Sequence, residues 1–236
     1  LVLLEAGFEQ PDPTPAPSAS VRPARFHSRA IWLVITAVVI VIFLLATITV
    51  AIAWMAFVKR AAEADEALRL LADAVITSGE YIADVVARNR ELAGMGTTMT
   101  SLALRNDRVA IAHVGDSRAY LLRDGELQQL TKDHTFVQTL VDAGQITREE
   151  AAVHPRRNLM MRAIDGIHAV EVDLSVREAR PGDRYLLCSD GLCGVLDDEM
   201  IGTLLAAQDL TVAVTGLVDA TMDAGAPDNV TVIVGE

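Results

Sequence analysis

The chain has 236 residues, of which 51% are hydrophobic, and its formal net charge at pH 7 is −12. An apolar fraction this high excludes a disordered chain. The acidic balance argues against nucleic-acid binding, which needs basic side chains to neutralise phosphates. Two cysteines, Cys188 and Cys193, are too few for a disulfide framework or a four-cysteine zinc site. Because the first residue is Leu1 and not Met, we expect a fragment or a processed form.

The N-terminal quarter of the chain divides into a proline-rich part and an apolar part. Residues 1–29 include five prolines between positions 11 and 23, which predicts an extended, disordered segment. Residues 30–58 contain no charged side chain, and about 20 apolar residues are enough for a helix to cross a bilayer. We therefore predict a single transmembrane helix at 30–58. A buried core helix and a cleaved signal peptide are the alternatives, and this run is too long and too uniformly apolar for either.

The remaining residues, 61–236, show the periodicities of a domain with helices and strands. Apolar residues at helical spacing in 61–93 predict two amphipathic helices, or one helix broken at Gly79. Further along, Asp124-Gly125 is a two-residue hairpin signal. The pattern indicates an α+β fold with antiparallel sheets and helices on their faces. We expect strands at 99–105, 109–114, 119–123, 126–131, 169–178, 185–188 and 230–234, and helices at 135–143, 147–152, 197–207 and 210–224.

Three aspartates stand where predicted strands begin or end. Asp116 and Asp190 follow apolar strands, and Asp228 precedes the last one. Carboxylates at such positions are suited to converge on a hard cation, because Mg²⁺ and Mn²⁺ prefer oxygen ligands. A cation of this kind activates water for the hydrolysis of phosphate esters. Taken alone, an aspartate at the end of a strand usually reflects ordinary turn chemistry, and the sequence alone does not show that the three converge.

Four short segments follow one another in a fixed order, and together they resemble a known family. They are Gly94-Met95-Gly96-Thr97-Thr98, Gly115-Asp116-Ser117-Arg118, Ser189-Asp190-Gly191-Leu192 and Pro227-Asp228-Asn229. In this order they resemble the bacterial members of the metal-dependent protein serine/threonine phosphatases of the 2C (PPM) type. The resemblance covers about residues 65–236 and extends to Thr131-Lys132-Asp133-His134.

The resemblance implies a fold, a cofactor and a set of site residues. The fold is a sandwich of two antiparallel sheets flanked by helices, and the cofactor is a cluster of Mn²⁺ or Mg²⁺ ions at one edge of the sandwich. Asp190 and Asp228 match ligands of the central two-metal site. Asp116 matches a ligand of the additional metal of bacterial members, at a site shared with Asp190. The implied partners are phosphoprotein substrates and a membrane serine/threonine kinase.

The N-terminal third of the family domain has no counterpart in this sequence. In the family, Arg-x-x-Asn-Glu-Asp and Asp-Gly-x-Gly-Gly segments supply the phosphate-binding arginine, an acidic ligand and the aspartate that bridges both metals. No acidic residue in 1–93 precedes a glycine. We therefore expect an incomplete α-β-β-α sandwich after the transmembrane helix, in which Asp190 and Asp228 alone hold one ion weakly. Such a domain is expected to be unstable or to be completed by a partner chain.

The remaining polar candidates have ordinary structural interpretations. We expect His113 to pack or hydrogen-bond within its strand and His154 to be a loop residue. We expect Cys188 to be a small buried hydrophobic residue. Cys193 is expected to be either buried as well or a reactive thiol.

Three hypotheses for the function follow from the sequence. The first is a membrane-anchored phosphatase that hydrolyses phosphoserine and phosphothreonine, with its domain in the cytoplasm. The second is a pseudophosphatase that binds phosphoproteins or a kinase at the membrane without turnover. The third is the product of a truncated or misassembled gene. Basic residues flank the apolar run equally on both sides, so their charge does not decide the orientation.

Overall fold

The computed structural model describes residues 26–236, with side chains from residue 39 onward. The disordered segment expected at 1–29 therefore lies almost wholly outside the described residues. The chain divides into two compact units, residues 1–55 and residues 56–236.

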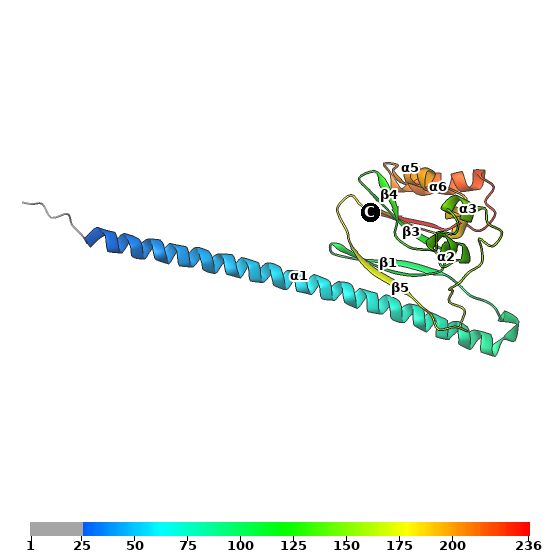
Figure 1. Ribbon diagram of the computed structural model, residues 1–236, viewed down its shortest axis with the longest axis horizontal. Coiled ribbons are helices and arrows are strands. Elements are labelled where there is room, and N and C mark those ends of the chain that lie inside the picture. The colour runs from blue at the N-terminus through cyan, green and yellow to red at the C-terminus, as the bar shows by residue number, and fades with distance from the viewer. Residues whose placement is uncertain (1–25) are drawn as a thin grey trace, which may run out of the picture. The chain divides into compact units, whose positions relative to one another are not determined.

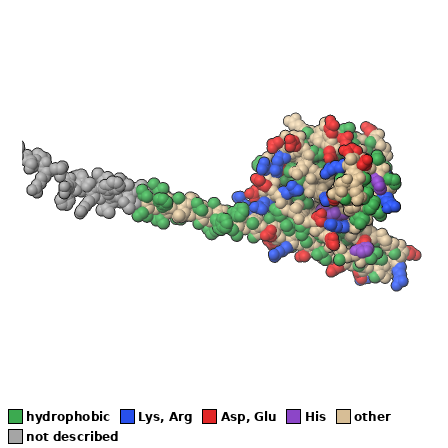
Figure 2. Space-filling model, in the orientation of Figure 1, with side chains coloured by type: hydrophobic (Ala, Val, Ile, Leu, Met, Phe, Trp, Pro, Cys, Tyr) green, Lys and Arg blue, Asp and Glu red, His purple; other side chains and the backbone are tan. Residues whose placement is uncertain are grey.

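The first long element is α1, a continuous helix over Phe26–Arg88. From Val39 it contains an 18-residue window with a mean hydropathy of 2.7, none of it buried. The coloured side chains of this apolar stretch are almost all hydrophobic (Figure 2). By length and composition, α1 is therefore able to cross a membrane.

The predicted break at Gly79 is wrong, because α1 passes through this residue without interruption. Gly79 is buried, and a Cβ atom built on it would lie 2.8 Å from the Val170 side chain and 3.6 Å from Ile164. The glycine therefore allows the segment around 164–170 to approach the helix closely. The cost of a glycine within a helix, about 1 kcal/mol relative to alanine, is offset here by this packing.

The second unit is an α-β-β-α sandwich, as the sequence predicted (Figure 1). One sheet has the order β1-β2-β5 and the other β4-β3-β6-β7, and all neighbouring strands are antiparallel. The strands are β1 (Met99–Arg105), β2 (Arg108–Val114), β3 (Arg118–Arg123), β4 (Glu126–Gln129), β5 (Asp173–Glu178), β6 (Arg184–Cys188) and β7 (Val232–Gly235). The helices are α2 (Phe136–Asp142), α3 (Arg148–Ala152), α4 (Asp190–Cys193), α5 (Asp198–Leu205) and α6 (Leu210–Asp223), with a 3-10 turn η1 at Arg90–Leu92.

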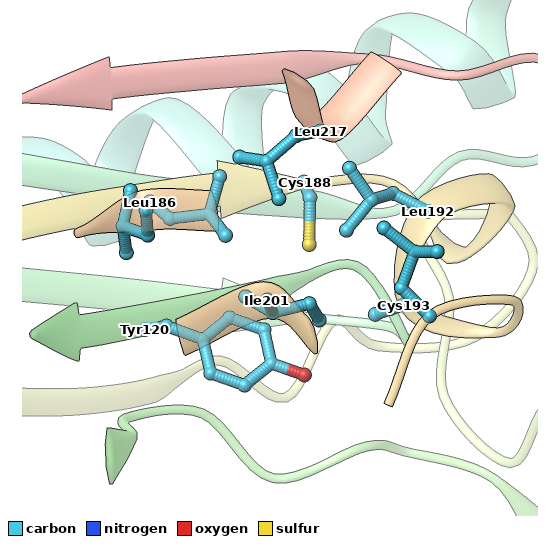
Figure 3. Packing of buried hydrophobic residues seen from close by; sticks show 9 residues of the cluster. Tyr120, Leu186, Cys188, Leu192, Cys193, Ile201 and Leu217 are labelled. Carbon is cyan, nitrogen blue, oxygen red and sulfur yellow. The ribbon is translucent and has the colours of Figure 1, made fainter. Parts of the chain in front are cut away.

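Three apolar clusters join the four layers of the sandwich. Val109 and Ile111 of β2 meet Leu121 of β3 between the two sheets. The second cluster joins the four-stranded sheet to α4, α5 and α6 around Tyr120, Leu186, Cys188, Leu192, Cys193, Ile201 and Leu217 (Figure 3). In the third cluster, Val75 and Ile82 of α1 cover the outer face of β2. The later part of α1 is thus a structural layer of the domain.

Turn chemistry fixes the β3–β4 hairpin as the sequence predicted. Asp124 and Gly125 both adopt left-handed conformations, with φ of 53° and 83°. Two residues of this kind form the tight turn that matches the twist of paired strands.

Replacing Ile82 with alanine is expected to destabilise the second unit by about 2–4 kcal/mol, because a buried large side chain is lost from the layer between α1 and β2. Ile76→Ala is the matched control, since Ile76 lies on the same helix but is 46% exposed, whereas Ile82 is 9% exposed. Thermal unfolding of the full chain in detergent, followed by circular dichroism, measures both. Equal midpoints for the two variants would contradict the assignment of α1 as a packed layer.

Candidate metal centre

The three aspartates lie at one end of the sheets, two of them in loops and one at the start of a helix. Asp116 comes two residues after β2 and is half-buried, Asp190 is the first residue of α4, and Asp228 lies in the loop before β7. Asp190 and Asp228 are exposed. All three line a single cavity of about 580 Å³. The sequence therefore identified three carboxylates that the fold brings to the same cavity.

The loops that carry Asp190 and Asp228 are joined by hydrogen bonds through Ser189. Its backbone N–H donates to the carbonyl of Thr231 at 3.1 Å, and its hydroxyl accepts from the N–H of Thr231 at 3.0 Å. The same hydroxyl donates to the carbonyl of Asn229 at 3.2 Å. These contacts hold residue 190 beside residue 228 without involving either carboxylate.

Gly191 allows the two loops to come this close. A Cβ atom built on Gly191 would lie 2.2 Å from the carbonyl oxygen of Asn229, a distance that a backbone atom cannot tolerate. The glycine after Asp190 thus allows α4 to approach the loop of Asp228 and Asn229 closely, and does not serve a turn.

The loop that carries Asp116 is held by His134 on both sides of Gly115. The backbone N–H of Gly115 donates to Nδ1 of His134 at 3.1 Å, and the N–H of His134 donates to the carbonyl of Gly115 at 2.7 Å. The opposite ring nitrogen, Nε2, lies 3.1 Å from Asp173. Since Nδ1 accepts a hydrogen bond, Nε2 carries the proton and donates to the carboxylate of Asp173. Gly115 has a φ of 116°, and its neighbour Thr98 leaves no room for a side chain.

Two further charged residues, Arg118 and Asp133, belong to the cavity wall. Arg118 donates from Nε and Nη2 to the two carboxylate oxygens of Asp133, at 2.9 and 2.8 Å. No function was predicted for Arg118 or Asp133 from the sequence, although both lie in segments that resemble the phosphatase family. The bidentate pair fixes the wall next to Asp116.

The carboxylates of the site influence each other electrostatically. Burial raises the pKa of Asp116, and the nearby charges of Asp190 and Asp133 raise it further. Like charges in proximity favour either protonation or a counter-cation. The donor chemistry of Asp116 and Asp190 therefore fits a hard divalent cation.

The number of ligands, however, is small. Within residues 26–236, no three His, Cys, Asp or Glu side chains lie close enough together to ligate one ion. Asp116, Asp190 and Asp228 share a cavity but do not form a compact ligand set. The described residues thus fit a partial site that offers one or two carboxylates to an ion.

The other candidates have structural roles. His113 is buried and contacts the Thr100 hydroxyl at 2.9 Å and the Lys132 carbonyl at 3.1 Å. His154 accepts a hydrogen bond from the backbone of Arg156 in its own loop. Both cysteines are buried, and the adjacent Cys188 thiol together with burial raises the pKa of Cys193 far above its ordinary value. Such a thiol is not a reactive nucleophile.

Comparisons with known proteins agree with this fold. A family model described as protein phosphatase 2C matches residues 51–140. Over 165 residues the chain is 52% identical to serine/threonine protein phosphatase PstP of Mycobacterium tuberculosis, covering 70% of this chain and 32% of PstP. A crystal structure of the PstP catalytic domain in complex with two manganese ions is 50% identical, with a TM-score of 0.62, and the match covers 66% of this chain and 65% of that one. The S. agalactiae serine/threonine phosphatase is 35% identical, with a TM-score of 0.68 and coverage of 72% and 71%.

The two-sheet fold and the matches at 35–52% identity place the second unit in the class of protein phosphatase 2C domains. The chain belongs to the protein phosphatase 2C family, whose bacterial members include PstP. It spans about a third of the length of PstP and just under two thirds of the PstP catalytic domain whose structure is known.

We expect Gly191→Ala to weaken Mn²⁺ binding, because the added methyl group pushes the Asn229 backbone away and separates Asp190 from Asp228. Overpacking of this kind costs about 1–3 kcal/mol of stability. Gly235→Ala is the control, since a Cβ atom there meets nothing within 4 Å. Isothermal titration with Mn²⁺ and thermal unfolding measure both effects. Unchanged Mn²⁺ affinity in a folded Gly191→Ala protein would refute the proximity argument.

Replacing His134 with alanine is expected to cost about 1–3 kcal/mol, because the buried N–H of Gly115 loses its acceptor. His134→Asn keeps an acceptor near the position of Nδ1 and should recover part of that loss. Denaturant unfolding ranks the three proteins. If the asparagine and alanine variants are equally unstable, the hydrogen bond to Gly115 does not determine the stability of this loop.

Proposed function

We propose that this chain is a membrane-anchored phosphatase of the 2C type, which hydrolyses phosphoserine and phosphothreonine in proteins with Mn²⁺ or Mg²⁺. The observation that carries the proposal is the position of Asp116, Asp190 and Asp228 around one cavity, in a chain 52% identical to PstP. A bound divalent cation supplies Lewis-acid activation of water and of the phosphoryl group. The residues of this chain position the carboxylates that would bind the cation.

Asp190 and Asp228 are the proposed ligands of the central site, and Asp116 contributes to a further site shared with Asp190. Ser189 and Gly191 keep the first two close together, and His134 fixes the loop of the third. Arg118 is already engaged by Asp133, so it shapes the cavity and is not the phosphate-binding residue.

Membrane anchoring is supported by the apolar part of α1, which we propose as a single transmembrane span at 30–58. The proposed phosphatase-like domain, residues 61–236, then lies in the cytoplasm, where phosphoprotein substrates and a membrane serine/threonine kinase are available. This orientation follows from the proposed activity.

A second candidate is a pseudophosphatase that binds phosphoproteins without turnover. The specific observation in its favour is the lack of a three-residue ligand set within residues 26–236. An active centre should bind at least two ions, whereas a binding module should bind one or none.

The test is hydrolysis of p-nitrophenyl phosphate by the full chain in detergent with Mn²⁺. We expect turnover that requires Mn²⁺ and falls at least 100-fold in Asp190→Ala, because one carboxylate ligand is lost at the reacting centre. Asp219→Ala is the control, since Asp219 is an exposed aspartate of α6 outside the cavity. A folded protein that binds at most one Mn²⁺ and shows no turnover would support the pseudophosphatase instead.

A further inference from the structure

The end of the apolar run on α1 is fastened to the turn between β1 and β2. Nη1 of Arg60 lies 3.1 Å from a carboxylate oxygen of Asp107, and Nδ2 of Asn106 donates to Glu63 at 2.7 Å. The guanidinium of Arg108 sits 5.9 Å from the centre of the Phe57 ring. Three separate contacts therefore hold the hairpin turn against residues 57–63, all within the second unit.

These contacts create a cluster of basic side chains that the sequence did not reveal. Lys59 and Arg60 come from α1, and Arg105 and Arg108 come from the two strands that flank the turn. We call these four residues the basic collar.

The carboxylates near the basic collar already interact with other side chains. Asp107 pairs with Arg60, and Glu63 pairs with Lys59 at 3.8 Å while accepting from Asn106. Glu178 stands opposite Arg108 in the sheet, and its carboxylate contacts Arg180 at 3.3 Å. Among the described residues, no ion pair is formed by Arg105. The collar therefore retains positive charge.

Arg105 and Arg108 are also directly opposite each other in the antiparallel register. Like charges at such positions repel and destabilise a strand pair. An anion next to the hairpin removes this repulsion. Arg108 lies beside Phe57, which is close to the end of the apolar run, so membrane headgroups are the nearest source of anions.

We propose that the basic collar binds anionic lipid headgroups and holds the β1–β2 hairpin against the membrane surface. The inference rests on the membrane anchoring proposed above. Basic residues near an anionic surface attract it within about one Debye length, ~10 Å at 0.1 M salt. Phe57 and Val58, the last residues of the apolar run, belong to the same compact unit as the basic collar.

The test uses the full chain in nanodiscs of phosphatidylcholine alone or with phosphatidylglycerol. Hydrogen exchange of residues 105–108 is measured by mass spectrometry. We expect phosphatidylglycerol to slow exchange by about 5–30-fold, the range that corresponds to one or two such interactions. High salt should abolish the difference. Equal exchange in both lipids would overturn the proposal.

Matched variants identify the residues that are responsible. Arg105→Gln should reduce the effect of phosphatidylglycerol about fivefold. Arg90→Gln removes the same charge in η1, just beyond the C-terminal end of α1, which lies about 45 Å from Val58 at 1.5 Å per helical residue, and should leave the effect unchanged. Unaltered exchange in β6 verifies the fold of each variant. If the two variants behave alike, the collar is not the lipid-binding surface.

Two controls test separately whether the chain inserts into the membrane and whether a soluble anion can replace the lipid headgroup. Flotation with phosphatidylcholine vesicles after an alkaline wash tests the anchoring itself, and a chain that does not insert overturns both proposals. A chain that inserts but ignores lipid charge overturns only the collar. Inorganic phosphate added to neutral nanodiscs that slows exchange equally would show a soluble-anion site and overturn the headgroup assignment.

Discussion

The burial of the outer face of the three-stranded sheet by α1 is the constraint on which the second unit depends. Val75 and Ile82 pack on Val114 and Ile164, and all four residues are nearly inaccessible to solvent. A sheet of three strands needs such a cover to bury both of its faces. Val114 is also the last residue of β2, so the same packing fixes the strand from which the loop of Asp116 departs.

The candidate site follows from backbone contacts more than from its charged groups. Ser189 and His134 hold two loops through main-chain hydrogen bonds, and Gly115 and Gly191 provide the space for those loops to approach. The carboxylates themselves are left to face the cavity. This arrangement separates the residues that position the site from those that would bind an ion, as is common in metal centres.

Much of the fold was predictable because its signals are local. The turn residues Asn106-Asp107 marked the end of β1, whose bounds agree with the prediction, and Asp124-Gly125 gave the β3–β4 turn. The helix through Gly79 was not predictable, since the reason for a glycine there lies about 85 residues further along, at Ile164 and Val170. The three aspartates were predicted through family motifs. The roles of Arg118, Asp133 and His134 depend on partners brought together by folding, which spacing alone does not reveal.

The last strand, β7, has a consequence for how the protein behaves at high concentration. Within the described residues it pairs only with β6, so its other edge presents backbone groups to solvent, and its own residue Ile233 is 59% exposed. Exposed strand edges act as templates for the addition of further strands. Overproduction should therefore drive association through this edge, and the net negative charge of the chain is the main force that opposes it. The yield of unaggregated protein in detergent then depends on ionic strength, because added salt screens that repulsion.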